Sequence, residues 1–372
     1  MLYLNRIKQS RTSEGTALDS RERLLKRLTE APGLPGYEGP VRDIFLDETD
    51  GLGDIELDRL GSVSCKKTGT ADSPRIMLAG HMDEVGWIVR SVSDDGYIKF
   101  RPLGGWWSQV MLAQRVTVYT RNGSYTGVTG SKPPHLLGDK RNSVVKIEDM
   151  YIDMGVSDGK YVTEEMGVQI GDMIVPKSEF EIVGDGKFYV AKAFDNRVAV
   201  AAVIETLRAL EGKEHPNAVF GVGTVQEEVG LRGARTSSWV AQPDIAFSLD
   251  VGIAGDVPGI NSYEASMKMG KGPALLYYDN SIIPHLNLRD FVVDTAKEEE
   301  IPLQSDFVMG GTDGGAIHLH QRGVPTVTIC VPSRHIHSHT SMIHRDDFDQ
   351  LVSLLAALIM RLDSKTTAGL QY

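Results

Sequence analysis

Residues 218–230, with the sequence AVFGVGTVQEEVG, decide the fold of this chain, because an apolar run ends there at two adjacent glutamates, Glu227 and Glu228. Unbroken apolar runs of this length are typical of strands buried on both faces of a parallel sheet. Three other apolar runs also end beside groups that bind metals or transfer protons, and they lie at 75–80, 245–249 and 326–331. We therefore predict an α/β fold whose mostly parallel, mixed sheet is flanked by helices.

The composition limits the possible functions. The chain has 372 residues, of which 41% are hydrophobic, so it can bury more than one domain core. Its formal charge of −11 and the lack of a basic block with interleaved aromatic residues exclude nucleic acid as an expected partner. Two cysteines, Cys65 and Cys330, are too few for a disulfide framework and suit buried thiols in a reducing compartment. No secretory signal or membrane span is visible, so we expect a soluble cytoplasmic protein without a membrane partner.

The texture of the sequence divides the chain into domains. Residues 1–20 are polar and are predicted to form an N-terminal extension. Between 87 and 186, short alternating runs are separated by Gly, Asp and Asn turns, and helical periodicity nearly disappears. This pattern predicts a small β-barrel or sandwich inserted into a catalytic domain built from 21–86 and 187–372. Within that catalytic domain, amphipathic periodicity predicts helices at 20–32 and 346–362.

The polar residues at the strand ends form a constellation. His81 and Asp83 follow the first buried run, and Asp250 follows the third. His337 lies a few residues after the fourth run, and Asp195 lies at a predicted strand-to-helix junction. Ligands of open α/β sheets collect outside the carboxyl ends of the strands, so these side chains should meet at one edge with the glutamate pair.

The types of residue in this constellation indicate a metal site. Imidazoles combined with carboxylates suit zinc, cobalt or manganese better than magnesium or calcium. One catalytic zinc needs about three protein ligands, whereas five are available here: His81, Asp195, Glu228, Asp250 and His337. Two metals sharing one carboxylate would use all five and would acidify a water held between them. One glutamate of the pair would then bind metal, and the other would remain free as a general base.

Each residue also has a purely structural interpretation. A pair of glutamates after a strand can be a solvated turn, and Asp195 can cap its helix. His81 and Asp83 can be a hydrogen-bonded loop pair. A metal site also needs at most one or two of the histidines in the C-terminal run, which are His335, His337, His339 and His344, and we expect His318 and His320 to be packing or surface residues. It is the joint arrangement that favours a catalytic site.

Several motifs resemble a known family. They are GHMDEVG at 80–86, GSKPPH at 130–135, KAFDNR at 192–197, TVQEEVGLRGA at 224–234, SLDVG at 248–252, GGTDGGAI at 310–317 and PSRHIHS at 332–338. In this order the motifs resemble the M42 family of dinuclear metalloaminopeptidases, of the tetrahedral or glutamyl aminopeptidase type, whose homologues include proteins labelled cellulases. The resemblance covers nearly the whole chain after about residue 20.

The resemblance implies a role for each residue and a way of assembling. His81 and Asp250 would bind one metal, Glu228 and His337 the other, and Asp195 would bridge them. Asp83 would orient His81, and Glu227 would be the general base. The implied fold is that of the zinc peptidases with a PDZ-like inserted domain, which would build dimers and then a hollow dodecamer. The implied cofactors are two divalent ions, zinc, cobalt or manganese.

We therefore predict an aminopeptidase that removes N-terminal residues from short peptides. Ser62 and His335 depart from the family pattern, which leaves the substrate preference open. One alternative is a metal-dependent deacylase or another hydrolase. A glycoside hydrolase is disfavoured because such enzymes normally work with two carboxylates and no metal pair. A non-catalytic scaffold is disfavoured because the set of ligands and base is intact.

Overall fold

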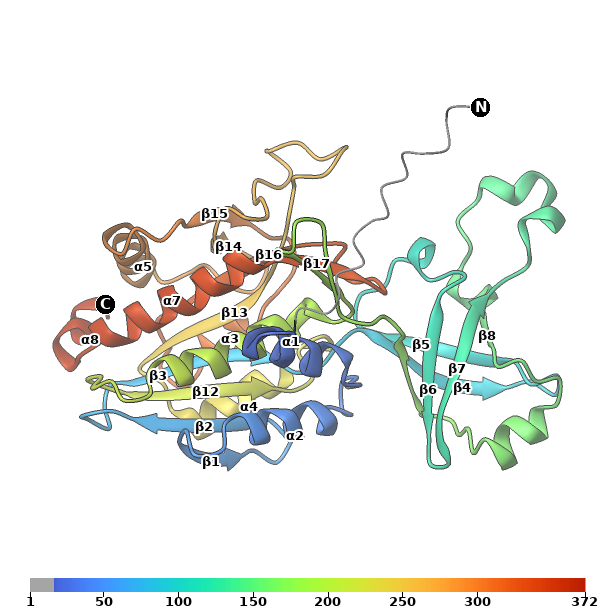
Figure 1. Cartoon of the computed structure of the whole chain (residues 1–372), viewed down its shortest axis with the longest axis horizontal. Coiled ribbons are helices and arrows are strands. Elements are labelled where there is room, and N and C mark those ends of the chain that lie inside the picture. Colours follow the sequence, from blue (N-terminus) through green and yellow to red (C-terminus); the bar gives the residue numbers. More distant parts are fainter. Residues whose placement is uncertain (1–16, 372) are drawn as a thin grey trace.

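The computed structural model describes residues 17–371, so most of the predicted polar extension at 1–20 lies outside the described residues. Two bodies of β-structure are present, an 11-stranded sheet covered by helices on both faces and a closed six-stranded barrel beside it (Figure 1). The predicted α/β class with an inserted all-β unit is confirmed. No helix within residues 17–371 is long and apolar enough to cross a membrane.

The centre of the large sheet is parallel. Strand β3 pairs in parallel with both β12 and β13, and β13 pairs in parallel with β16, so the carboxyl ends of these four strands lie at one edge. Strands β14 (Ala274–Tyr278) and β15 (Gln304–Phe307) pair beside this path. Along the main path the order is β1 (Asp54–Leu57), β2 (Val63–Thr68), β12 (Ala218–Thr224), β3 (Arg75–His81), β13 (Ile245–Ile253), β16 (Thr326–Arg334), β17 (Ser341–His344), β11 (Phe188–Ala191) and β10 (Glu181–Val183).

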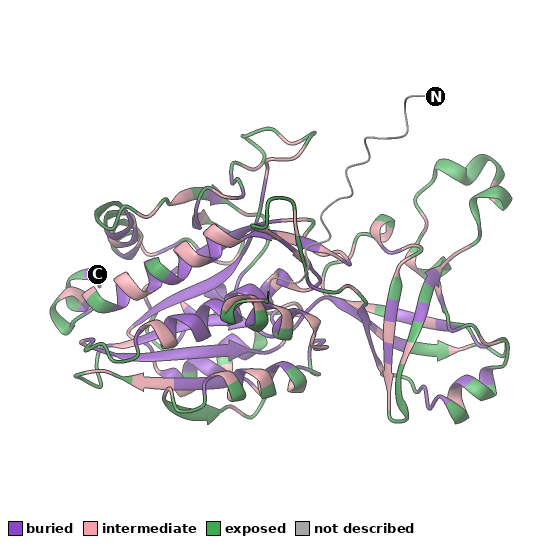
Figure 2. Ribbon diagram, viewed as in Figure 1, coloured by how far each residue is buried: buried purple, intermediate pink, exposed green. Residues whose placement is uncertain are grey.

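Both faces of the central strands are buried, which explains their unbroken apolar sequence (Figure 2). Ile76 and Leu78 of β3 belong to the main core, whereas Met77 and Ala79 belong to a second core on the opposite face. Successive side chains of a strand point to opposite faces, so a run without polar residues is what two covered faces require.

Helices α1, α3 and α7 contribute to the main core, and α4 and α6 contribute to the second. Asp19 caps α1 by accepting a hydrogen bond from the backbone N–H of Glu22. Helix α3 crosses β3 closely, since a Cβ added at Gly80 would lie 2.8 Å from Cβ of Ala199. The helices are α1 (Ser20–Glu30), α2 (Gly39–Glu48), α3 (Phe194–Ala209), α4 (Arg232–Ala241), α5 (Leu286–Glu298), α6 (Gly314–Ile317), α7 (Arg345–Arg361) and α8 (Ser364–Leu370).

The barrel has its own core around the buried Trp87. The chain enters the barrel shortly after His81 and leaves it after β9 (Met173–Pro176), from which it returns to the large sheet through β10 and β11 (Figure 1). The strand order of the barrel is β4 (Gly86–Val92), β5 (Ile98–Leu103), β8 (Tyr151–Asp153), β7 (Gly123–Gly130), β6 (Arg115–Thr120) and β9. Short helical turns lie at Ser108–Val110, Pro134–Leu136, Gly138–Asn142, Ile147–Asp149 and Tyr161–Glu165.

Candidate metal centre

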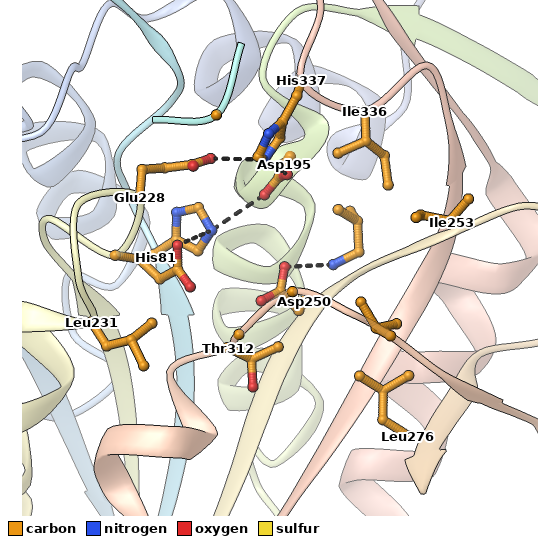
Figure 3. Close-up of a pocket in the computed structure, with 16 residues that line it drawn as sticks. His81, Asp195, Glu228, Leu231, Asp250, Ile253, Leu276, Thr312, Ile336 and His337 are labelled. Atoms are coloured by element: carbon orange, nitrogen blue, oxygen red, sulfur yellow. Dashed lines mark hydrogen bonds and ion pairs between the residues drawn. The ribbon is translucent and has the colours of Figure 1, made fainter. Parts of the chain in front are cut away.

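A cavity of about 550 Å³ opens at the carboxyl edge of the large sheet (Figure 3). Each central strand delivers a functional side chain to it. His81 is the last residue of β3, Asp250 lies within β13, and His337 follows β16. Glu227 and Glu228 follow β12, and Asp195 lies in the first turn of α3. Six of the seven side chains predicted from these strand ends and from α3 therefore line one cavity, and Asp83 is not among the described lining residues.

Asp195 lies between the two imidazoles. Its Oδ1 is 3.2 Å from Nε2 of His81, and its Oδ2 is 3.3 Å from Nε2 of His337. The N-cap position of α3 is occupied by Ala193, and Asp195 lies in the first turn with a non-helical backbone (φ −78°, ψ 102°). One carboxylate thus has an oxygen directed to each histidine, which is the arrangement that a shared ligand requires.

The donor atoms fall into overlapping groups. His81, Asp195 and Asp250 offer atoms within 4.8 Å of one another, as do Asp195, Glu228 and His337. These two groups share only Asp195. A third group joins His81 to both Glu227 and Glu228, so either glutamate is within reach of His81.

The centre concentrates buried negative charge. Burial raises the pKa of Asp250 and of Glu227 well above their usual values, and burial together with the charge of Asp195 raises the pKa of Glu228 to about 8. Oε1 of Glu228 is buried, lies 3.5 Å from Nε2 of His337 and accepts no hydrogen bond from the described residues. Such crowding favours a bound cation, because a cation stabilises the ionised carboxylates. The donor set therefore fits divalent metal ions.

The two imidazoles lower the pKa of the Asp195 carboxyl group. Burial alone would raise the pKa of this carboxyl group, but hydrogen bonds with His337 and His81 outweigh it and hold the pKa below its usual value. Burial lowers the pKa of His337, yet the same carboxylate and Glu228 raise it to about 9. Without a cation, the histidines thus supply the positive charge of the centre.

Asp83 supports both sides of the centre. Its Oδ1 and Oδ2 accept hydrogen bonds from the backbone N–H groups of Glu227 and Glu228, each at 3.0 Å. Nδ1 of His81 lies 3.1 Å from the backbone carbonyl oxygen of Asp83. This oxygen accepts a hydrogen bond from the Nδ1–H group, which leaves Nε2 free as a ligand atom. The motif interpretation predicted the orientation of His81 but not the contact with the glutamate turn.

A glutamate that the sequence reasoning missed supports the same turn. Glu38 is only 4% exposed, and its Oε1 accepts hydrogen bonds from the backbone N–H of Gln226 at 3.0 Å and of Gly36 at 2.8 Å. Gln226 has a φ of +56°, so the turn needs such fixing. Burial raises the pKa of Glu38 to about 6. No periodicity or motif spacing in the sequence distinguishes Glu38 from a surface residue at a helix start.

A buried ion cluster underlies the centre. Nζ of Lys192 donates to both carboxylate oxygens of Glu84, at 2.6 and 2.8 Å, and Arg197 donates to the same carboxylate at 3.4 Å. Burial lowers the pKa of Lys192 to about 8. The sequence signal was the motifs themselves, since Glu84 lies in GHMDEVG and both Lys192 and Arg197 lie in KAFDNR, but no role was assigned to these residues.

A further acid, Asp313 of the GGTDGGAI motif, was also missed. It is buried, and its Oδ2 accepts a hydrogen bond from the hydroxyl of Thr224, the last residue of β12. Burial raises its pKa to about 6. The signal available was the motif itself, from which no chemistry was assigned to Asp313.

Only one histidine of the C-terminal run reaches the cavity, and it is His337. His335 is exposed, and His339 packs against Trp87 and Trp106 with ring centroids 5.5 Å apart in each case. His344 caps α7 by accepting a hydrogen bond from the backbone N–H of Asp346. Neither His335 nor Ser62, the two departures from the family pattern, is among the described residues that line the cavity.

The chain is similar to known aminopeptidases in sequence and in structure. The model of the M42 glutamyl aminopeptidase family matches residues 61–354. The chain is 38% identical to the glutamyl aminopeptidase of Lactococcus lactis, over 93% of this chain and 98% of that protein. It is 46% identical to the crystal structure of a TET aminopeptidase from a marine-sediment Thaumarchaeota archaeon, with a TM-score of 0.93 and coverage of 95% and 100%. It is also 32% identical to the TET1 peptidase of Pyrococcus horikoshii, which can assemble into a tetrahedron or a large octahedral shell, with a TM-score of 0.82 and coverage of 92% and 100%.

Proposed function

The chain belongs to the M42 glutamyl aminopeptidase family, and we propose that it uses two divalent metal ions to remove N-terminal residues from short peptides. The observation that carries this proposal is the position of Asp195, which lies 3.2 Å from one histidine and 3.3 Å from the other. In the proposed centre, His81 and Asp250 would hold one ion, Glu228 and His337 would hold the other, and Asp195 would be the shared ligand. Zinc, cobalt and manganese suit this mixture of imidazole and carboxylate donors.

The metals would supply two kinds of chemistry when bound, polarisation of the scissile carbonyl and a lowered pKa of a water molecule. The protein supplies the proton transfer. Glu227 belongs to neither of the two donor groups that share Asp195, and we propose that its carboxylate stays unligated and accepts a proton. Burial raises the pKa of Glu227, which favours a group that must hold this proton and then release it to the leaving amine. Asp83 fixes the backbone from which Glu227 projects.

The inserted barrel is the part of the chain that we propose for assembly. It lies beside the sheet rather than over it (Figure 1). Leu136 and Val144 in its long loop are exposed. Homologous peptidases that assemble into closed shells support a homo-oligomer built from dimers, with a tetrahedral dodecamer as the proposed form. The buried free thiols of Cys65 and Cys330 support a reducing, cytoplasmic location.

The proposal is tested by measuring metal content and cleavage on the same preparation. We expect about two transition-metal ions per chain after saturation. We also expect hydrolysis of peptides with a free N-terminus and none of their N-acetylated forms. Substantially fewer than two bound ions without turnover would favour the scaffold alternative. Cleavage of N-acyl substrates alone would favour the deacylase and overturn the aminopeptidase assignment.

A further inference from the structure

The cavity has an apolar side next to Asp250. We define this apolar wall as five residues: Val251, Ile253, Leu276, Val308 and Ile336. Figure 3 shows Ile253, Leu276 and Ile336 on the side of Asp250 that lies away from His81. The wall combines β13, β14, the segment after β15 and the connection between β16 and β17.

Two residues of the wall are sequence neighbours of proposed metal ligands. Val251 directly follows Asp250, and Ile336 directly precedes His337. Leu276 is only 2% exposed and lies at the base of the wall, whereas Ile253 is 49% exposed and lies at its rim. Apolar side chains gathered in a cavity of this size indicate that an apolar group of a ligand covers them.

The charged residues of the cavity are already assigned. The ionisable side chains among the described lining residues are all proposed as metal ligands or as the general base: His81, Asp195, Glu227, Glu228, Asp250 and His337. Arg334, on the strand that leads to Ile336, pairs with Asp256 at 2.7 Å. The described lining therefore offers no further charge to pair with an acidic or basic substrate side chain. Burying such a side chain unpaired is costly.

From these observations we propose that the apolar wall selects peptides whose N-terminal side chain is large and aliphatic, such as leucine, isoleucine or methionine. The inference rests on the proposed function, because cleavage after the first residue places the carbonyl of that residue at the metal centre. Its side chain then extends past Asp250 onto the wall. The preference differs from the glutamyl specificity in the name of the Lactococcus lactis relative.

The size of the expected preference follows from burial. Each methylene that the wall covers favours binding, and pockets discriminate single methylenes by about 10–200-fold. We expect kcat/KM for leucine p-nitroanilide to exceed that for the alanine compound by about 10-fold or more. We expect the glutamate and lysine compounds to be slower than the leucine compound by about 100-fold or more, since their charge would lose water without gaining a partner.

A charge placed at the rim should change the preference. Ile253→Lys adds a cation beside the wall without filling its base, so the ratio of glutamate to leucine turnover should rise by about 10-fold or more. Ile253→Glu should raise the ratio of lysine to leucine turnover instead. Ile55→Lys is the matched control, because Ile55 is also a half-exposed strand isoleucine, at 39%, and lies outside the cavity. It should leave both ratios unchanged.

The experiment measures kcat/KM of the metal-saturated full-length protein on aminoacyl p-nitroanilides and on dipeptides varied at the second position. A wild-type preference for glutamate or lysine, or no preference, overturns the inference but leaves the proposed function intact. A preference that follows the second residue also overturns it, since the wall would then hold that residue. Hydrolysis of no free-amino substrate would overturn the proposed function itself. Thermal shifts with leucinamide and glutamic acid α-amide test the wall without turnover, and a larger shift with the glutamic compound contradicts the inference.

Discussion

Oδ1 of Asp83 accepts a hydrogen bond of 3.0 Å from the backbone N–H of Glu227, and Oδ2 accepts one of the same length from the next residue. A single buried carboxylate therefore sets the direction of two adjacent glutamate side chains. Through its backbone carbonyl oxygen, the same residue fixes the ring of His81. The metal ligands and the proposed base thus share one support, and a small change at Asp83 should be felt on both sides.

Replacing Asp83 by Asn should weaken metal binding and activity together. The side-chain amide of asparagine has only one oxygen, so its NH₂ group would face the backbone N–H of Glu227 or Glu228. That buried N–H would then have no acceptor. We expect metal affinity to fall by about 10–100-fold, as for other residues that orient ligands, with a loss of at least the same size in kcat/KM. Asp153→Asn is the control, because its exposed carboxylate also accepts a backbone hydrogen bond, from Gly155 at 2.8 Å. Unchanged metal affinity in Asp83→Asn, by competition with a chelator, would contradict this role.

Changing Glu227 or Glu228 to glutamine should have different effects on metal content and on turnover. Glu227→Gln removes the proposed base but no proposed ligand, so kcat should fall by about 10²–10⁴-fold while metal content is retained. Glu228→Gln removes a ligand and should lose one ion. Elemental analysis beside steady-state kinetics distinguishes the variants, each being a control for the other. Full activity of metal-loaded Glu227→Gln would show that another group moves the proton.

Glu38 should make stability depend on pH. Its pKa is about 6 in the folded protein and 4.5 ordinarily, so the folded state binds more protons between these values. The stability from the protonated group is present below pH 4.5 and is lost as the pH rises through 6. The free energy of unfolding of the wild type, relative to Glu38→Gln, should be about 2 kcal/mol lower at pH 7 than at pH 4. Urea unfolding with a chelator present measures it, and a difference independent of pH refutes the assignment.

Adding a methyl group at Gly80 should disturb the contact between β3 and α3. A Cβ there would lie 2.8 Å from Cβ of Ala199 and 2.9 Å from its backbone carbon, so the strand and helix must separate. We expect Gly80→Ala to destabilise the protein by about 1–3 kcal/mol. It should also reduce activity, because this contact holds His81 near Asp195. Gly369→Ala is the control, since within residues 17–371 no atom outside the neighbouring backbone of α8 lies within 4 Å of its added Cβ. An equal melting temperature for both variants would refute the packing argument.

The strands that build the centre could be predicted because strands buried on both faces consist almost entirely of apolar residues. An apolar run covered on both faces is recognisable, and the residue after it is placed by the direction of the sheet. Two ends were misjudged, since β13 continues to Ile253 and β16 to Arg334, beyond the predicted 249 and 331. Beyond these positions β13 and β16 remain hydrogen-bonded to each other, with Ile253 opposite Ser333. Backbone pairing that continues past an apolar run has no recognisable sequence pattern.

The residues that support the centre could not be predicted in the same way. Glu84 is distant in sequence from Lys192 and Arg197, and each of these charged residues alone is typical of a surface. Only their meeting in the interior makes them a buried cluster. The apolar wall was equally hidden, since Leu276 and Ile336 come from short segments without strong periodicity. Interactions between distant segments decide these contacts, whereas local pattern decides the central strands.

The insertion of the barrel after β3 has a consequence for biosynthesis. The barrel strands are contiguous from Gly86 to Pro176, whereas the partners of β3 in the sheet, β12 and β13, begin only at Ala218 and Ile245. At ordinary rates of translation, on the order of ten seconds separate β3 from β12. All strands of the barrel are therefore synthesised while β3, which ends at His81, still lacks both of its partner strands. Because His337 is synthesised after the other proposed ligands, we expect the metal centre to form only once the segment that carries His337 has emerged from the ribosome.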